Sequence, residues 1–128
     1  MSIGKLCTGI QHLGLPTANM DATLAFYSAI GFENIYSTVN DGSRVCFLKL
    51  GDMVIETYES DSVVGKTGAI DHIALNVTDI DAVFALAKEL DLPTDDKEVN
   101  FLPFFEKGVR FFTLVGPNAE KVEFNQKL

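Results

Sequence analysis

A short line of sequence occurs twice in this chain, and each copy carries one of the chain's two histidines. The first copy is IQHLGL at residues 10–15, and the second, sixty positions later, is IDHIAL at 70–75. A repeat of two copies indicates two modules that share a core, since a solenoid needs more copies to bury its apolar faces. We therefore predict a tandem of one supersecondary unit.

The first module is predicted to be β-α-β-β-β. Alternating apolar residues indicate a strand at 8–15, which ends at Pro16 and Thr17. A helix over about 20–30 follows, with Asn19 as its N-cap and Gly31 as its C-terminal stop. Three short strands complete the module, at 34–39, 44–50 and 53–59, with a hairpin turn at 40–42.

The second module repeats this order after the linker 60–69, which is small, polar and glycine-containing. A strand is expected at 70–77 and a helix at about 80–90, with Thr78 as the N-cap candidate. The last strands are expected at about 98–101, 109–114 and 120–126. The fold class is therefore α+β. One domain, 1–128, contains tandem βαβββ modules, about 8–59 and 70–126, which pair their sheets into an open, cup-like barrel.

Strand alternation places one histidine and one glutamate of each module on the sheet face that its helix leaves open. Ile55 should face the helix and Glu56 the opposite side, and Val122 and Phe124 leave Glu123 in the same position in the second module. Taken singly, such residues are more often structural or solvated than metal ligands. Their joint placement at equivalent repeat positions favours a metal site, with four candidate ligands: His12, Glu56, His72 and Glu123.

Two imidazoles and two carboxylates suit a divalent transition metal and suit Ca²⁺ poorly. We expect one ion per site, Zn²⁺ or Ni²⁺ first, with Co²⁺, Mn²⁺ and Fe²⁺ as alternatives. With four protein ligands, an octahedral ion keeps two positions for water or substrate and is open to Lewis-acid catalysis.

Charge and composition exclude several other classes of partner. Ten Lys+Arg against eighteen Asp+Glu give a net charge of −8, which argues against nucleic acid or an anionic membrane surface. No apolar stretch approaches the roughly 20 residues of a membrane span, and no signal peptide is expected. Cys7 and Cys46 follow neither a disulfide framework nor a zinc spacing, which favours a cytoplasmic protein.

At these residues the chain resembles the vicinal oxygen chelate superfamily, the group of glyoxalase I, bleomycin-resistance proteins and extradiol dioxygenases. The likeness covers Gly9 to Gln126. The segments that carry it are 11–15, 25–27, 54–56, 71–75, 116–118 and 122–124.

The resemblance implies a ligand set and an activity. Glyoxalase I-like enzymes bind metal through one His or Gln and one Glu per module, and all four positions are filled here. Extradiol dioxygenases and fosfomycin-resistance enzymes have two His and one Glu, without a counterpart of Glu56. The chain is therefore most similar to the glyoxalase I (lactoylglutathione lyase) type, with methylmalonyl-CoA epimerase as a close chemical relative. Small members of the group also imply a homodimer.

The implied reaction is a lyase or isomerase reaction on a small vicinal-oxygen substrate, such as a 2-oxoaldehyde adduct. Glu123 or Glu56 would be the general base, and the proton would move by way of a metal-bound enediolate. The sequence leaves the choice between the two glutamates open. Three alternatives also stay open: a methylmalonyl-CoA epimerase-like enzyme, a non-catalytic small-ligand binding protein of the antibiotic-resistance type, and a metal-dependent dioxygenase or thiol transferase.

Three further residues are candidates for substrate contact. Phe104 and Phe105, in the loop 102–108, suit an apolar lid or wall, with core packing as the alternative. Arg110 suits bidentate carboxylate or phosphate binding, with a surface charge as the alternative. Residues 15–19 lack the arginine that glutathione-using glyoxalases carry there, which puts glutathione as a substrate partner in doubt.

Overall fold

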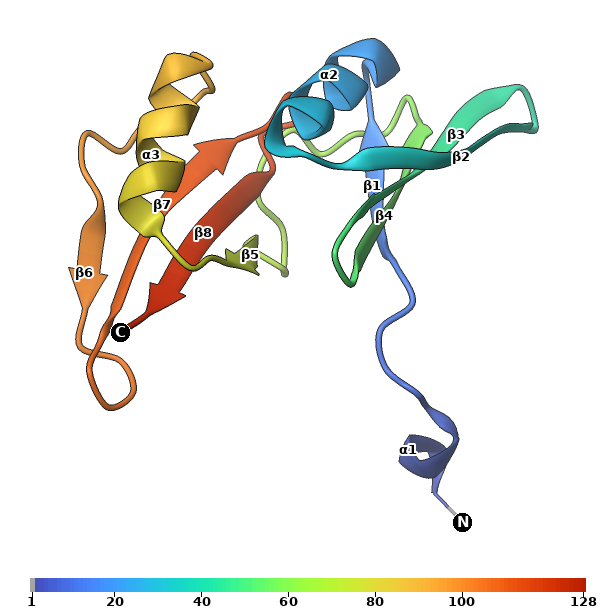
Figure 1. The fold of residues 1–128 in the computed structure, drawn as a ribbon. Coiled ribbons are helices and arrows are strands. Elements are labelled where there is room, and N and C mark those ends of the chain that lie inside the picture. The colour runs from blue at the N-terminus through green and yellow to red at the C-terminus, as the bar shows by residue number, and fades with distance from the viewer. Residues whose placement is uncertain (1) are drawn as a thin grey trace. The chain divides into compact units, whose positions relative to one another are not determined.

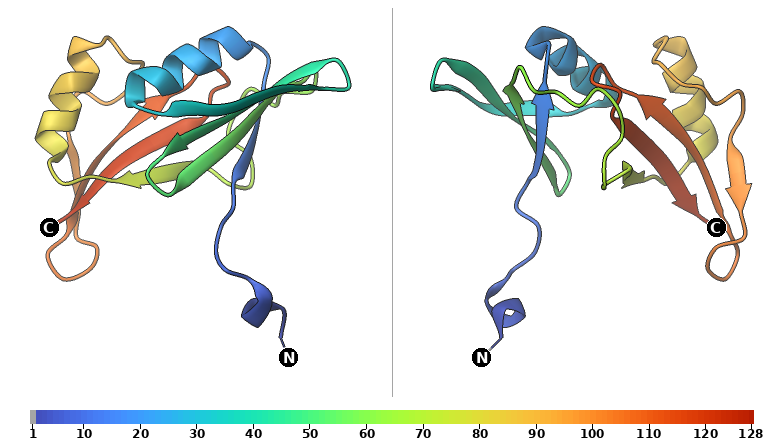
Figure 2. Two further views of the ribbon diagram at one scale, coloured as in Figure 1. Left: turned by 45° about the vertical axis from the view of Figure 1, so that its right-hand side comes forward. Right: turned by 180° about the vertical axis from the view of Figure 1, so that it is seen from behind.

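The computed structural model describes residues 2–128. The chain divides into two compact units, Met1–Ser62 and Val63–Leu128, and the division lies within residues 60–69. Each unit contains one four-stranded mixed sheet with a helix on one face (Figures 1 and 2). The α+β class and the βαβββ order are confirmed, while the pairing of the two sheets into a cup stays a prediction. Within residues 2–128, no helix is long and apolar enough to cross a membrane.

The two sheets have the same topology. Unit 1 has the strand order β1-β4-β3-β2, and unit 2 has the order β5-β8-β7-β6. In each sheet the first and last strands of the unit pair in parallel, and the other pairings are antiparallel. The strands of unit 1 are β1 (Leu13–Thr17), β2 (Glu33–Asn40), β3 (Ser43–Leu50) and β4 (Met53–Glu59); those of unit 2 are β5 (His72–Asn76), β6 (Asn100–Leu102), β7 (Val109–Val115) and β8 (Lys121–Lys127). A short helix, α1 (Ile3–Leu6), precedes β1.

The first strand of each unit begins later than predicted. β1 covers 13–17 rather than 8–15, and β5 covers 72–76 rather than 70–77. The pairing of β1 with β4 begins at Leu13, opposite Ile55. Residues 8–12 are therefore outside the β1–β4 ladder. Pro16 lies inside β1, and this is tolerated because β1 is an edge strand with a partner on one side.

Capping residues define the two main helices, α2 (Met20–Ile30) and α3 (Ile80–Glu89). Asn19 caps α2 by accepting a hydrogen bond from the Ala22 amide, and Gly31 ends the helix at φ 116°, as predicted. The predicted cap of α3, Thr78, is wrong. The cap is Asp79, whose carboxylate accepts from the Ala82 amide and also places a negative charge at the positive end of the helix.

The hairpin turn at 40–42 is confirmed, with Asp41 and Gly42 both at positive φ as a type I′ turn requires. The predicted facing of the last strands is also confirmed. Ile55 and Val122 are fully buried on the helix side of their sheets, while Glu56 and Glu123 keep partial exposure on the other side. Each helix therefore covers one face of its sheet, and the glutamate lies on the opposite face.

Candidate metal centre

In unit 1 the structure brings His12 and Glu56 together. His12 immediately precedes β1, and Gly14, two residues later, pairs with Glu56 of β4. The imidazole Nε2 lies 3.8 Å from Glu56 Oε1, and both side chains are about one-third exposed. Phe47 is opposite Glu56 in the ladder and packs edge-to-face on the His12 ring, with centroids 5.8 Å apart. This aromatic contact limits the positions that the imidazole can take.

Unit 2 repeats the same arrangement with His72 and Glu123. Ala74 pairs with Glu123, as Gly14 pairs with Glu56 in unit 1. The distance from His72 Nε2 to Glu123 Oε1 is 3.7 Å. The residues opposite the two glutamates, Gly14 and Ala74, are both small and carry no side chain beyond Cβ. The sequence repeat is therefore a repeat in three dimensions, since both units place a histidine and a glutamate at the same register.

The other ring nitrogen of each histidine is held by the residue that precedes it. His12 Nδ1 lies 2.9 Å from Gln11 Oε1, and His72 Nδ1 lies 2.9 Å from Asp71 Oδ2. Both contacts turn Nε2 toward the glutamate. The hydrogen bond with His72 lowers the pKa of Asp71, and Lys121, 3.5 Å away, acts in the same direction.

These pairs have the chemistry and spacing of half-sites for a divalent transition metal. Imidazole nitrogen and carboxylate oxygen are ordinary ligands of such ions, at about 2.1 Å, so two neighbouring ligands lie roughly 3.0–3.4 Å apart. The observed distances of 3.7 and 3.8 Å exceed this by a few tenths of an ångström. Across residues 2–128, no group of three or more His, Cys, Asp or Glu side chains gathers closely enough to hold an ion. Each unit therefore offers two donors.

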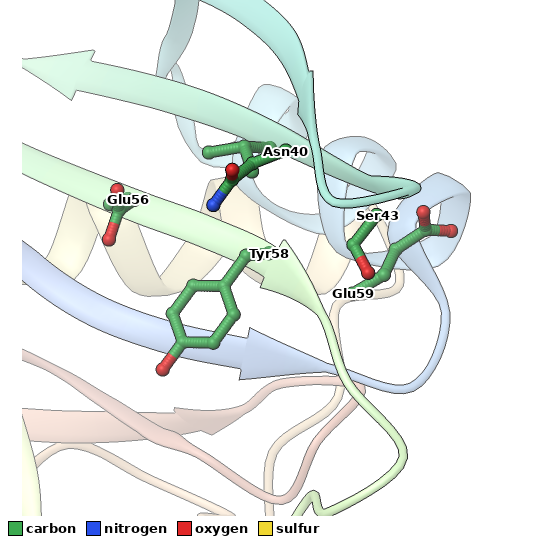
Figure 3. A pocket seen from close by; sticks show the side chains of 6 residues that line it. Asn40, Ser43, Glu56, Tyr58 and Glu59 are labelled. Atoms are coloured by element: carbon green, nitrogen blue, oxygen red, sulfur yellow. The ribbon is translucent and has the colours of Figure 1, made fainter.

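A hollow of about 310 Å³ opens beside Glu56 in unit 1 (Figure 3). Glu56 and Tyr58 line it from β4, and no cationic side chain is among the residues that form it. The carboxylates of Glu56 and Glu59 in its lining favour neutral or cationic groups over anions. The lining residues are Asn40, Ser43, Val45, Glu56, Tyr58 and Glu59.

Arg110 lies on the helix side of its sheet. Phe112, two residues along β7 and therefore on the same face, pairs with Phe124 on the buried side of the sheet. Glu123 pairs with Thr113 on the open side. The Arg110 guanidinium binds both carboxylate oxygens of Asp81, in the first turn of α3, at 2.7 and 2.9 Å. This hydrogen-bonded pair lowers the pKa of Asp81 and raises that of Arg110. Its position on the helix side of the sheet, away from Glu123, disfavours substrate binding by Arg110. The alternation of residues along β7 could have predicted this position from the sequence.

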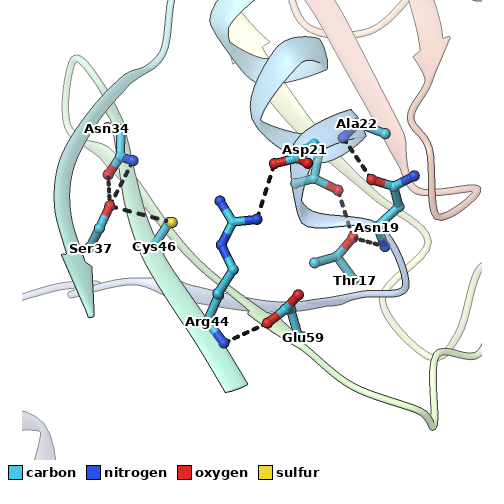
Figure 4. Close-up of polar contacts among 10 residues, drawn as sticks. Thr17, Asn19, Asp21, Ala22, Asn34, Ser37, Arg44, Cys46 and Glu59 are labelled. Atoms are coloured by element: carbon cyan, nitrogen blue, oxygen red, sulfur yellow. Dashed lines mark hydrogen bonds and ion pairs between the residues drawn. The ribbon is translucent and has the colours of Figure 1, made fainter. Parts of the chain in front are cut away.

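Arg44 of unit 1 has the same role on its own sheet. Its Nη1 donates a hydrogen bond of 3.0 Å to Oδ1 of Asp21, in the first turn of α2 (Figure 4). The hydrogen bond with Asp21 raises the pKa of Arg44. Both arginines of the chain thus tie a helix N-terminus to the third strand of a unit.

Phe104 and Phe105 are exposed, by 54% and 72%, so neither fills the core of unit 2. Phe105 has φ 62°, a left-handed conformation unusual for a large side chain. Its ring lies under the Lys127 ammonium, 4.1 Å from the centroid, a cation–π contact that holds the loop. Core packing, the alternative for this aromatic cluster, applies instead to Phe112, which is fully buried.

Comparison with known proteins assigns the family of this chain. The sequence model of one protein family, the Glyoxalase/Bleomycin resistance protein/Dioxygenase superfamily, matches residues 9–99 of the chain. The chain belongs to this superfamily. The matched segment includes His12, Glu56 and His72 and ends before Glu123.

Relatives and solved structures extend the likeness over nearly the whole chain. The uncharacterized protein YwbC of Bacillus subtilis (strain 168) is 28% identical over 127 residues, covering 92% of this chain and 97% of that protein. A glyoxalase family protein from Enterococcus faecalis superimposes with a TM-score of 0.79 at 23% identity, covering 94% and 98% of the two chains. The fosfomycin resistance protein FosX of Listeria monocytogenes, solved with Mn(II) and sulfate, gives 0.72 at 21% identity, covering 95% and 94%. These structures share the fold of both units.

Proposed function

We propose that this protein is a metal-dependent lyase or isomerase of the glyoxalase I type. One divalent transition ion, Zn²⁺ or Ni²⁺ first, is held by His12, Glu56, His72 and Glu123, supplied by one chain or by two chains of a homodimer. The observation that carries the proposal is the repeated His–Glu pair, with Nε2–Oε1 distances of 3.8 and 3.7 Å. Membership of a superfamily that includes a Mn(II)-bound protein supports a metal in this fold.

The chemistry follows from the donors that the chain presents. When bound, the ion supplies Lewis-acid polarisation of a substrate carbonyl. One of the two glutamates, Glu56 or Glu123, accepts the proton from the carbon next to that carbonyl. The same carboxyl group then returns the proton to the former carbonyl carbon, and the hydroxyl proton on the first carbon passes to the oxygen on the second. The reaction is therefore a net isomerisation without an added oxidant or reductant.

The substrate is a small molecule with adjacent oxygen functions and little negative charge. Both arginines are engaged with aspartates on the helix faces, and the hollow beside Glu56 contains no cation. If the substrate is an adduct of a 2-oxoaldehyde with a thiol, glutathione is a poor candidate for that thiol, because it carries two carboxylates. Phe104 and Phe105 supply an exposed apolar surface that can cover a bound substrate.

Metal analysis followed by an isomerisation assay tests the proposal. The full chain is purified without added metal and its content measured by mass spectrometry, then again after dialysis against Ni²⁺, Zn²⁺ or Mn²⁺. We expect one ion per four-ligand site. The loaded protein is then assayed with methylglyoxal adducts of glutathione and of neutral thiols, and turnover should favour the neutral adducts. Metal content far below one ion per site, with no gain on dialysis, would contradict the proposal.

The second candidate is a binding protein that holds a small polar ligand without turnover. The hollow of about 310 Å³ favours it, since its size suits a ligand and most of its lining is not part of the proposed ligand set. Calorimetry with the unreacted adducts separates the two functions. Saturable binding without product formation by the metal-loaded protein would support the binding protein over the enzyme.

A further inference from the structure

The two His–Glu pairs are held by different neighbours, and this difference has a chemical consequence. We propose that Asp71 is a positioning residue that locks His72 with Nε2 free. The pair His72–Glu123 is then the better preorganised half of the proposed ligand set. The inference rests on the proposed function, because the group to be bound is the divalent ion.

A neutral imidazole exists as two tautomers. Such a ring has one N–H and one nitrogen lone pair, and only the nitrogen with the lone pair can bind a metal. A carboxylate accepts hydrogen bonds and cannot donate them. Asp71 Oδ2, at 2.9 Å from His72 Nδ1, therefore requires the proton on Nδ1 and leaves the lone pair on Nε2. That lone pair is on the nitrogen that faces Glu123.

Gln11 contacts His12 at the same distance with a different chemical group. Its amide oxygen accepts from Nδ1 at 2.9 Å, which favours the same tautomer. A half-turn of the amide, however, presents its NH₂ group to Nδ1 and stabilises the ring with the proton on Nε2. That tautomer cannot bind an ion through Nε2. Because Gln11 supports both tautomers and Asp71 only one, His12 is the less prepared ligand.

Further contacts in unit 2 hold Asp71 and Glu123 in place. The Lys121 ammonium lies 3.5 Å from Asp71 Oδ1, and Lys121 pairs with His72 in the β5–β8 ladder. Asn125 donates to Glu123 Oε2 at 3.0 Å, which leaves Oε1 for the side that faces His72. The Glu123 side chain is 15% exposed, against 30% for Glu56.

Unit 1 has other side chains at the positions that correspond to Lys121 and Asn125. The last strands of the units align Glu56 with Glu123, so Val54 corresponds to Lys121 and Tyr58 to Asn125. Valine cannot form an ion pair with the residue before the histidine, and a phenol replaces the amide beside the glutamate. The supporting contacts are thus a property of unit 2.

Imidazole NMR on the ion-free full chain tests the tautomers directly. Long-range ¹H–¹⁵N spectra at about pH 8.5, roughly two units above the ordinary pKa of a histidine, distinguish the Nδ1–H and Nε2–H forms. His12→Gln and His72→Gln assign the two rings. In the unmodified chain we expect His72 almost wholly as Nδ1–H and His12 as a mixture. Asp71→Asn should turn His72 into a mixture, and Gln11→Glu should shift His12 to Nδ1–H.

Ion affinity is then measured by calorimetry with Zn²⁺ alone. Asp71→Asn should weaken binding by about tenfold, within the range of roughly 10–100-fold for partners that orient a ligand. Gln11→Glu should strengthen it. Asp81→Asn is the matched control, because it removes an equal charge from an aspartate that contacts Arg110 and neither histidine. It should leave both the tautomers and the affinity unchanged.

The possible outcomes separate this inference from the proposed function. Equal tautomer populations of the two histidines, or an unchanged His72 spectrum in Asp71→Asn, would overturn the positioning role. A shifted tautomer with unchanged Zn²⁺ affinity would overturn the claim that Asp71 prepares His72 to bind the ion. If the unmodified chain binds no ion, the proposed function fails, and the ion-free spectra still decide whether Asp71 orients His72.

Discussion

The two units have one topology and one His–Glu register, but their helix-side interiors differ. Unit 1 buries three threonines, Thr17, Thr23 and Thr57. The Thr17 and Thr23 hydroxyls form a hydrogen bond of 2.8 Å with each other. The backbone amide of Asn19 donates to the Thr17 hydroxyl at 3.0 Å (Figure 4). Thr57 is fully buried with no hydrogen-bond partner for its hydroxyl.

Unit 2 has apolar residues at the same repeat positions, Val77, Val83 and Phe124. The Phe124 ring stacks on Phe112, with centroids 5.2 Å apart and planes 23° apart. The features that the units share are those that position the His–Glu pair: the parallel first and last strands, the helix cap and the small residue beside the glutamate. The packing behind the sheet can vary because it does not reach the open face.

The aromatic stack should make unit 2 the more sensitive to truncation of its core. Phe112→Ala should lower the free energy of unfolding by about 3–5 kcal/mol, because a fully buried ring that also contacts Phe84 is lost. Leu48, a buried residue of β3 that pairs with Ile55 in unit 1, has no aromatic stack to lose, so Leu48→Ala should lower the free energy of unfolding by less, about 2–3 kcal/mol. Urea unfolding of the full chain followed by circular dichroism measures both. A larger loss from Leu48→Ala would reverse the comparison.

Removing one carboxylate from each half of the ligand set tests whether both halves bind the ion. Glu56→Gln and Glu123→Gln should each lower Zn²⁺ affinity by at least about tenfold, the lower limit for residues that only support a ligand. Glu123→Gln should have the larger effect, because Asn125 holds that side chain in place. Calorimetry is the measurement, with the exposed Glu89→Gln as control. A normal affinity in Glu56→Gln would indicate a two-His-one-Glu site.

The helix caps test whether equivalent residues do equivalent work in the two units. Asn19→Ala and Asp79→Ala should each destabilise the chain by about 1 kcal/mol, because each leaves a first-turn amide without its acceptor. Thr78→Ala, beside the cap, should change stability by much less. The midpoint of urea unfolding reports all three. A large effect from Thr78→Ala together with none from Asp79→Ala would restore Thr78 as the cap.

The lone hydroxyl of Thr57 offers a stabilising change in unit 1. Thr57→Val has nearly the same shape and removes a buried polar group without a partner, so stability should rise by about 1 kcal/mol. Thr23→Val, in contrast, should lower stability because Thr17 loses its hydroxyl partner. Thermal unfolding of both variants checks the prediction. Destabilisation by Thr57→Val would mean that its hydroxyl has a partner in solution.

The smallest effect concerns the ion pair between Asp81 and Arg110 in unit 2. The hydrogen bond from Arg110 lowers the pKa of Asp81 below its ordinary 3.8, so the folded state binds this proton less readily than the unfolded state. The pair therefore stabilises the fold above pH 3.8, and this contribution is lost as the pH falls through the lowered pKa. Asp81→Asn should be slightly less stable than the original at pH 6 and equal to it at about pH 2. A difference that persists in acid would point to packing rather than charge.

Much of the architecture follows from the sequence, because strand alternation and turn chemistry are local. The positions of Ile55 and Val122 toward the helix, with Glu56 and Glu123 on the opposite side, needed only a period of two residues. The turn at Asp41-Gly42 needed only the tolerance of these residues for positive φ. The offset of sixty residues also aligns Asn19 with Asp79. The repeat alone would therefore have predicted Asp79, and not Thr78, as the N-cap of α3.

The tertiary structure decided the features that depend on distant parts of the chain. The start of β1 depends on where the ladder with β4 begins, and the role of Arg110 depends on an aspartate twenty-nine residues away. The residue before each histidine turns Nε2, but only the strand opposite places the glutamate that this nitrogen faces. The sequence by itself thus determined which residues face the open side of each sheet. Only the fold determined how closely they approach, because distance across a ladder is set by pairing and not by periodicity.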